Sequence, residues 1–204
     1  MGSRARGGTR WKRFGVVMVP AVAATAAIGV AMSQGALAAS FAVSGQSFKV
    51  TTERLVNTDG FVQYGTLNKK ADGDYVPVAV SAFNSATITK LCQSVVVPTP
   101  IGDVTVKLGA GADPKKPVKA KNLFIDLAEL DANATFTNID IGVSASHTSK
   151  GPKPTGDFTP GSFAQQAEAA TLTNVRQTAW ATTAGTFELN GLNIKLHRGK
   201  NECY

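Results

Sequence analysis

Apolar and polar residues alternate over short stretches through much of the chain beyond residue 38. The clearest stretch is 103–108, in which Val104, Val106 and Leu108 fall on one side of an extended chain and polar residues fall on the other. A period of two predicts a β-strand with one buried face and one solvated face. Comparable stretches, bounded by turn residues, predict further strands at 40–51, 60–67, 75–82 and 123–127.

A second pattern, Ala-Thr-Φ-Thr-X-Φ with Φ apolar, occurs at 86–91, 134–139 and 170–175. Its two apolar residues are three positions apart, an odd step that would place them on opposite faces of a flat strand. We therefore predict that each copy is a strand, then a bulge or corner, then a second strand, with residues such as Asn138 and Asn174 tolerating the unusual backbone. The alternative to duplication is chance recurrence in a Thr-rich β sequence.

Leu189 and Leu192 show the same spacing around Asn190-Gly191, which fits either another corner or a two-residue hairpin turn. Together the patterns predict an all-β fold. We expect a single domain with a curled or sandwiched, mostly antiparallel sheet built from duplicated strand-bulge-strand units. Loops are predicted at 109–121 and 148–161, a helical turn is an alternative at 127–130, and only 163–170 has a composition suited to a helix, although it could equally lead into a strand.

The first 38 residues differ from the rest of the chain. Five basic residues and no acid precede an uncharged run of 19 residues at 14–32, and Ala36-Leu37-Ala38 follows. This order is typical of an export signal cleaved after Ala38. A retained membrane-anchor helix is the alternative, because the run is nearly long enough to span a bilayer. We therefore predict an export signal or anchor at 1–38 and a β domain at 39–204, extracellular or in the cell envelope.

Removing residues 1–38 changes the charge balance. The chain has 21 Lys and Arg against 14 Asp and Glu, and five of the basic residues lie in that segment, which leaves 16 against 14. A nearly neutral domain without a basic patch argues against nucleic acid as a partner. We interpret Lys115, Lys116, Lys119 and Lys121 as a solvated loop, with contact to anionic lipid or wall polymer as the alternative.

Cys92 and Cys203 are predicted to form one disulfide. An even, minimal number of cysteines in an exported chain is typical of such a bond. It would tie the C-terminus to the first repeat and close a loop of more than 100 residues. The wide separation of the two cysteines and the presence of only two histidines disfavour a metal or redox role.

Residues suited to catalysis are few. Ser144 and Ser146 lie close to His147 and could supply a nucleophile and a base, but adjacency in sequence does not bring side chains together, and a polar loop is the simpler interpretation. The other histidine is His197. The chain has no serine elbow, no zinc-protease motif, no phosphate-binding loop and no dinucleotide-binding motif. No catalytic residue, cofactor or metal site is therefore predicted.

Two smaller features have alternative interpretations. The sequence Asp72-Gly73-Asp74 could bind a cation, but it is more often simply a turn. Trp180 is the only Trp outside the predicted export segment. It lies in a β-prone stretch, so we expect it to pack on a core face more readily than to contact a ligand.

Four segments carry a family resemblance. They are ASFAVSG at 39–45, GFVQYG at 60–65, QTAWATTAG at 177–185 and RGKNECY at 198–204. Together they resemble an actinobacterial family of small exported proteins of unknown function, over nearly the whole chain. Some members of that family carry the label cholesterol esterase, so the resemblance implies lipid-ester hydrolysis as an alternative activity.

The leading hypothesis is a non-enzymatic cell-envelope protein that binds a lipid or other apolar partner, or that builds surface structure. The alternative is a secreted lipid-ester hydrolase that uses Ser144 or Ser146 with a histidine. A third hypothesis is an assembly module whose strand edges pair with a second copy or with a membrane or envelope protein. A carrier requires an apolar cavity, whereas a hydrolase requires a serine and a histidine that meet at a pocket.

Overall fold

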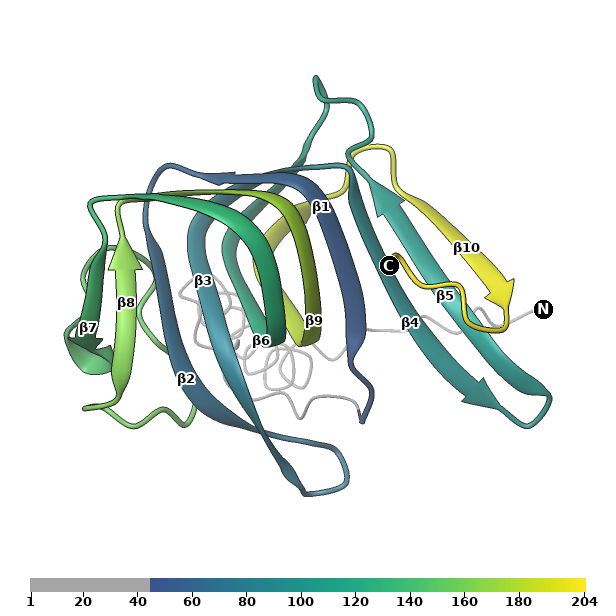
Figure 1. Cartoon of the computed structure of the whole chain (residues 1–204), viewed down its shortest axis with the longest axis horizontal. Coiled ribbons are helices and arrows are strands. Elements are labelled where there is room, and N and C mark those ends of the chain that lie inside the picture. Colours follow the sequence, from purple (N-terminus) through teal and green to yellow (C-terminus); the bar gives the residue numbers. More distant parts are fainter. Residues whose placement is uncertain (1–44) are drawn as a thin grey trace, which may run out of the picture. The chain divides into compact units, whose positions relative to one another are not determined.

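The computed structural model describes residues 45–204, which form one antiparallel sheet of ten strands (Figure 1). This confirms the predicted all-β fold with a mostly antiparallel sheet. The predicted export signal or anchor helix lies outside the described residues. The strands are β1 Phe48–Asn57, β2 Phe61–Lys69, β3 Tyr75–Thr89, β4 Leu91–Thr99, β5 Gly102–Ala110, β6 Val118–Thr137, β7 Asp140–Ser144, β8 Phe163–Ala167, β9 Ala169–Glu188 and β10 Asn193–Arg198; a short 3₁₀ helix, η1, spans Ala145–His147. No helix within residues 45–204 is long and apolar enough to cross a membrane.

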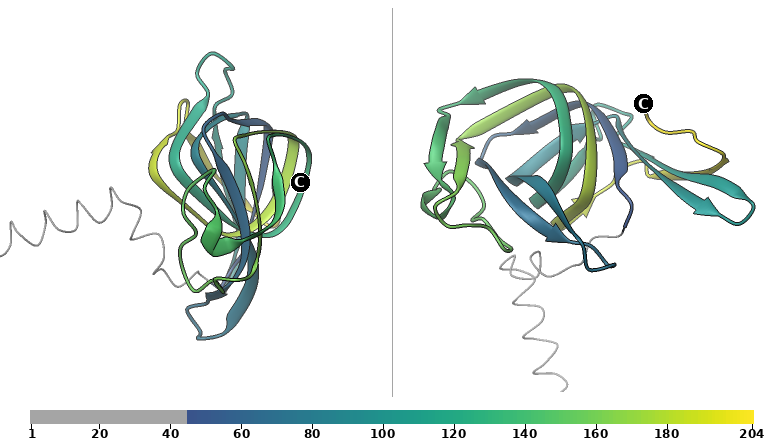
Figure 2. Two further views of the ribbon diagram at one scale, coloured as in Figure 1. Left: turned by 90° about the vertical axis from the view of Figure 1, so that its left-hand side faces the viewer. Right: turned by 60° about the horizontal axis from the view of Figure 1, so that its bottom comes forward.

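The order of strands across the sheet is β10-β5-β4-β1-β9-β6-β3-β2-β8-β7. One further pairing closes part of this sheet into a ring, because the end of β3 also pairs with β1, through Val56 opposite Thr87 and Arg54 opposite Thr89. The ring therefore contains β1, β9, β6 and β3, and the views in Figure 2 show how the long strands curl around it. β4, β5 and β10 extend away from the ring on one side (Figure 1).

The structure confirms the predicted corner in all three copies of the repeat. The backbone φ at position X is +51° at Lys90, +50° at Asn138 and +54° at Asn174. This left-handed conformation offsets the odd spacing, so that both apolar residues of a copy reach the same core. Leu172 and Val175, for example, are both buried in the cluster inside the ring.

The corners on neighbouring strands coincide in space. β1 pairs with β3 and β4 on one side and with β9 on the other. The register of these pairings places Glu53 of β1 opposite Lys90 on the first side and opposite Asn174 on the second. Glu53 also forms an ion pair with Lys90. Left-handed residues at the same level of neighbouring strands bend a sheet along a common line, and such bends allow a sheet to curl and close. The repeated corner thus accounts for the curvature that creates an interior.

The predicted loop at 109–121 is shorter than expected, because β6 begins at Val118. Lys119 and Lys121 are exposed as predicted, but they lie on this strand rather than in a loop. The alternative of a helical turn at 127–130 is also wrong, since these residues continue β6. β6 pairs with β3 on one edge and β9 on the other, and this pairing outweighs the local composition.

The structure also tests three other predicted segments. The first described strand is 48–57, where a strand at 40–51 was predicted, and residues 40–44 lie outside the described residues. Residues 163–167 form β8, which pairs with β2, so the strand rather than the helix alternative holds there. Residues 189–192 form a turn in which the Leu192 N–H donates to the Leu189 carbonyl at 3.2 Å. This turn is not a hairpin, because it carries the chain from β9 to β10, which pairs with β5 instead.

The sheet has apolar side chains on both faces. One cluster fills the ring, and a second lies on the outer face of β2, β3 and β6. The predicted loop at 148–161 folds over this outer cluster, where the Tyr64 hydroxyl donates to the Thr155 carbonyl at 3.0 Å and accepts from the Thr155 N–H at 3.0 Å. Phe158 contacts the Tyr64 ring edge-on, and Trp180 packs against the same cluster, as expected for a core residue.

Asp126 gives a prediction about pH. It is half-buried on β6, where burial raises the pKa of its carboxyl group more than the hydrogen bond from Asn68 lowers it. The ionised form is therefore less favourable in the folded chain than in the unfolded chain. The resulting loss of folding stability is absent at pH values below the pKa of the Asp126 carboxyl group in the unfolded chain. It grows as the pH rises from there toward the higher pKa of the same group in the folded chain. We expect Asp126→Asn to be more stable than the wild type at pH 7, as measured by urea unfolding. The two proteins should be equally stable at a pH low enough to protonate Asp126 in both the folded and the unfolded chain. A variant that is less stable at pH 7 would contradict the assignment.

Candidate functional site

A cavity of about 210 Å³ lies inside the curled sheet. Side chains from six strands line it, namely from β1, β2, β3, β6, β8 and β9. Most of these side chains are apolar, and about half are both apolar and buried, because they occupy the inward positions of strands whose outward positions face the second cluster or solvent. They include Leu55, Phe61, Phe83, Ile125, Leu127 and Leu172.

Three aromatic rings form one end of the cavity. The ring of Phe61 lies 5.2 Å, between centroids, from the ring of Phe83 and 5.2 Å from the ring of Phe136. These contacts connect β2 and β3 to the end of β6. Ala134, which also lines the cavity, is exposed, so the cavity reaches the surface beside this end of β6. Among the described strands, the part of β6 beyond Leu127 pairs only with β9.

The remaining wall carries uncharged polar groups, from Gln63, Ser81, Gln165 and Gln177. Gln63 and Gln165 face each other across β2 and β8, and the Gln165 amide donates to the Gln63 side-chain oxygen. The Gln63 amide in turn donates to Ser81 Oγ at 2.8 Å. Among the described residues that line the cavity, none is charged. The arrangement therefore suits a neutral, mostly apolar ligand with few uncharged polar groups.

Sequence analysis did not identify this polar wall. The alternation along β2 could have indicated it. Phe61 and Gln63 point into the cavity, whereas Val62 and Tyr64 belong to the outer cluster. A glutamine at an inward position is notable, because a buried amide requires hydrogen-bonding partners. Its partner Gln165 lies 102 residues further along the chain, so the sequence alone did not reveal the pair.

The structure brings Ser144, Ser146 and His147 together at the end of β7 and in η1. Ser146 Oγ lies 3.2 Å from His147 Nδ1 and 3.0 Å from Ser144 Oγ, and the Ser144 hydroxyl donates to the Pro160 carbonyl at 2.7 Å. Each hydroxyl has one proton. When Ser144 donates to Pro160, Ser146 donates to Ser144, and His147 Nδ1 must then donate to Ser146. With all three bonds formed, His147 is a donor rather than a base. None of these side chains lines the cavity.

The other candidate residues, Asp72, Asp74 and His197, lie outside the cavity. Asp72 and Asp74 bind Lys70, whose Nζ lies 3.0 Å and 3.3 Å from their carboxylates, and the Asp74 N–H donates to Asp72 Oδ1 at 3.1 Å. The interpretation of this segment as a turn therefore describes it better than a cation site. His197 is on β10 opposite Thr105, outside the cavity.

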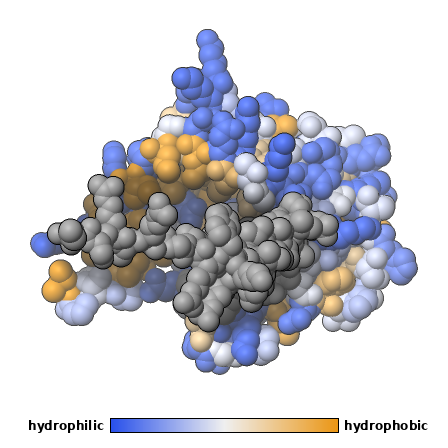
Figure 3. Space-filling model, turned by 180° about the vertical axis from the view of Figure 1, so that it is seen from behind, coloured by the Kyte–Doolittle hydropathy of each residue, from blue (hydrophilic) through white to orange (hydrophobic). Residues whose placement is uncertain are grey.

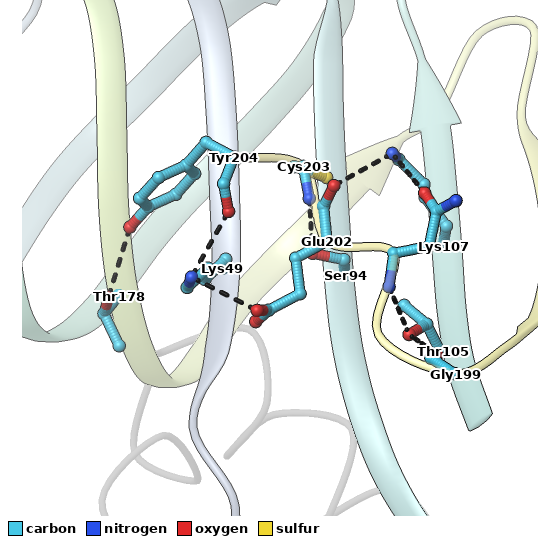
Figure 4. Close-up of polar contacts among 10 residues, drawn as sticks. Lys49, Ser94, Thr105, Lys107, Thr178, Gly199, Glu202, Cys203 and Tyr204 are labelled. Atoms are coloured by element: carbon cyan, nitrogen blue, oxygen red, sulfur yellow. Dashed lines mark hydrogen bonds and ion pairs between the residues drawn. The ribbon is translucent and has the colours of Figure 1, made fainter. Parts of the chain in front are cut away.

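Cys92 of β4 and Cys203 are joined in a disulfide, with Cα atoms 6.0 Å apart. Beside it, the Cys203 N–H donates to Ser94 Oγ at 2.9 Å. The disulfide anchors residues 199–204, which lie across β5, β4 and β1 (Figure 4). Further contacts of this segment are those of Gly199 and Asn201 with Thr105, of Glu202 with Lys49 and Lys107, and of Tyr204 with Lys49 and Thr178.

Comparison with known proteins adds one finding. No curated protein and no solved structure matches the chain. A family of unknown function (DUF6230) matches residues 44–204, a range that contains every described strand, the cavity and the disulfide. This agrees with the predicted resemblance to a family without an assigned function. The chain therefore belongs to the family of unknown function DUF6230.

Proposed function

We propose that this domain binds a neutral apolar ligand, such as part of a lipid, as a non-enzymatic component of the cell envelope. The cavity inside the curled sheet is the observation that carries the proposal. Within residues 45–204, its wall combines aliphatic and aromatic side chains with the amides of Gln63, Gln165 and Gln177, and it includes no charged residue. Binding sites for small molecules have this composition, in which apolar surface gives affinity and a few polar groups fix orientation.

The size of the cavity limits what it can hold. A cavity of about 150 Å³ lined by Leu, Ile and Phe accommodates benzene, whereas sites for drug-sized molecules measure about 300–1,000 Å³. A volume of about 210 Å³ therefore suits one ring or a short length of acyl chain. The rest of a larger ligand would extend out beside Ala134, where the cavity reaches the surface.

Two observations support the exported location that the proposal includes. The segment at 1–38 has the order of basic, apolar and small residues that is typical of an export signal. The disulfide between Cys92 and Cys203 suits an oxidising compartment outside the cytoplasm.

A matched pair of ligands tests the proposal. We expect 1-octanol to raise the unfolding temperature of the protein, because a ligand at about 100 times its Kd stabilises the folded state by about 2.7 kcal/mol. Octanoate has the same chain length but carries a charge, and the lining residues offer that charge no partner. We therefore expect octanoate to stabilise the protein much less at pH 7. Stabilisation by neither compound, or by octanoate alone, would contradict the proposal.

A lipid-ester hydrolase is the second candidate. It rests on the contact of 3.2 Å between Ser146 Oγ and His147 Nδ1, and it requires that His147 Nδ1 accept the hydrogen bond rather than donate it. A neutral chromogenic ester such as p-nitrophenyl octanoate tests it. Hydrolysis that is lost in Ser146→Ala and His147→Ala but retained in His197→Ala would support the hydrolase and overturn the non-enzymatic proposal. Equal rates of hydrolysis in the wild type and the three variants would leave no catalytic role for Ser146 and His147.

A further inference from the structure

The part of the sheet that extends away from the ring has two different faces. We refer to β4, β5 and β10 as the wing. Side chains directly opposite each other in the register share a face, and the pairs Val97 with Val104, Val95 with Val106, and Val106 with Leu196 all lie on one face of the wing. Ile194 continues this face beside Leu108. The result is an uninterrupted apolar surface across three strands.

The opposite face of the wing is covered. Thr105 and Ser94 lie on it and are both fully buried, because residues 199–204 cross over them. The apolar face has no such cover among the described residues: Leu196 is 71 % exposed and Ile194 is 60 % exposed. In the view from behind, hydrophobic residues gather on the side of the molecule where the wing lies (Figure 3). A contiguous exposed apolar patch that spans several strands is typical of an interaction site.

The tip of the wing adds a second feature. β4 and β5 are joined by Pro100 and Ile101, and Ile101 is 86 % exposed, the largest exposed fraction among the large hydrophobic residues described. Arg198 lies opposite Val104, close to this tip and on the apolar face. Lys195 lies opposite Lys107 on the covered face, and Lys200 belongs to the segment that crosses that face. The apolar face itself carries Arg198 and no acidic side chain.

We propose that the apolar face of the wing docks on an anionic lipid surface, with Ile101 inserted among the acyl chains and Arg198 beside the headgroup phosphates. Charge decides between this surface and a second copy of the chain. In a symmetric dimer formed through this face, Arg198 of each copy would meet no acidic side chain, because the face carries none. An anionic bilayer complements Arg198, and interfacial proteins combine an apolar patch with basic residues in this way. The inference does not depend on the cavity.

The test places an indole at the tip of the wing. Ile101→Trp and, as a matched control, Ile141→Trp are prepared in the protein purified from its own host. Ile141 is an exposed isoleucine on β7, the opposite edge strand of the sheet. Each variant is mixed with vesicles of phosphatidylcholine and phosphatidylglycerol whose acyl chains are brominated, and emission is compared with that of the wild type, which supplies the background of the natural tryptophans. We expect the added emission at position 101 to be quenched several-fold more than that at position 141.

Two further measurements complete the test: the effect of removing the charge of Arg198 on vesicle binding, and the oligomeric state without lipid. We expect Arg198→Gln to weaken binding to these vesicles about fivefold, because one basic residue near an anionic membrane has about that effect. Vesicles of phosphatidylcholine alone should bind more weakly. Equal quenching at positions 101 and 141, or no quenching at position 101, would overturn the proposal. A dimer in the absence of lipid that Leu196→Ser dissociates, without quenching by vesicles, would assign the face to a second copy instead.

Discussion

Loss of the disulfide between Cys92 and Cys203 is expected to lower the free energy of unfolding by about 4 kcal/mol. The two cysteines are 111 residues apart in sequence, so the bond closes a long loop and removes many conformations from the unfolded chain. In the chain-entropy account, a closed loop of about 100 residues contributes roughly 4.7 kcal/mol at 25 °C. The effect should therefore be a large fraction of the stability of a domain of this size.

Urea unfolding of the oxidised protein, the reduced protein and the double variant Cys92→Ser/Cys203→Ser measures this effect. The reduced protein and the double variant should have the same midpoint, well below that of the oxidised protein. The reductant should not change the double variant, which serves as the control. Residues 199–204 also contact Ser94, Thr105 and Lys49, so a midpoint unaffected by reduction would show that these contacts suffice to hold the segment.

Gly60→Ala is expected to destabilise the protein by about 3 kcal/mol, through backbone strain and overpacking together. Gly60 has a φ of +118°, in the turn between β1 and β2. A Cβ atom there would lie 2.8 Å from Asn84 Nδ2, 2.9 Å from the Lys150 carbonyl oxygen and 3.0 Å from Gly151 Cα. Two of these atoms are backbone atoms of the loop that covers the outer cluster, so the loop would have to move.

Gly73→Ala is the matched control for this substitution. Gly73 also has a positive φ, of +97°, but no atom lies within 4 Å of the place that its Cβ would occupy. Gly73→Ala should therefore lower the free energy of unfolding only by the cost of holding alanine at a positive φ, about 1 kcal/mol. The difference between the two variants in urea unfolding isolates the steric contribution at Gly60. Equal destabilisation by the two substitutions would mean that the loop at 148–161 does not pack against this turn.

The bends of the sheet could be predicted from the sequence. The odd step in Ala-Thr-Φ-Thr-X-Φ implied an unusual backbone at Asn138 and Asn174, and both have a positive φ. The same conformation at Lys90 shows that the pattern itself matters more than the preference of asparagine for that region. Asn122, with a φ of +48°, bends β6 between Ala120 and Leu123, which have the same spacing outside the repeats.

The closure of the sheet and the cavity could not be predicted in the same way. They depend on pairings between distant residues, such as Val56 with Thr87 and Gln63 with Gln165, which no local pattern records. Composition left 163–170 open between a helix and a lead into a strand, and pairing with β2 makes residues 163–167 a strand. Long-range pairing decides secondary structure where local preference is weak.

The central claim is that the cavity inside the curled sheet holds a neutral apolar ligand. Native mass spectrometry of the protein purified from its own host tests it most directly, because a bound ligand adds mass that denaturation removes. Two variants that add the same ring to the same strand sharpen the measurement. Ala132→Phe places the ring where Ala132 lines the cavity, whereas Ala128→Phe places it at an exposed position that does not line it.

Wild type and Ala128→Phe are predicted to carry the same additional mass, and Ala132→Phe is predicted to have lost it while unfolding at a temperature close to that of the wild type. The mass itself would then identify the ligand. A wild-type protein without additional mass, or an Ala132→Phe variant that retains it, would contradict the account.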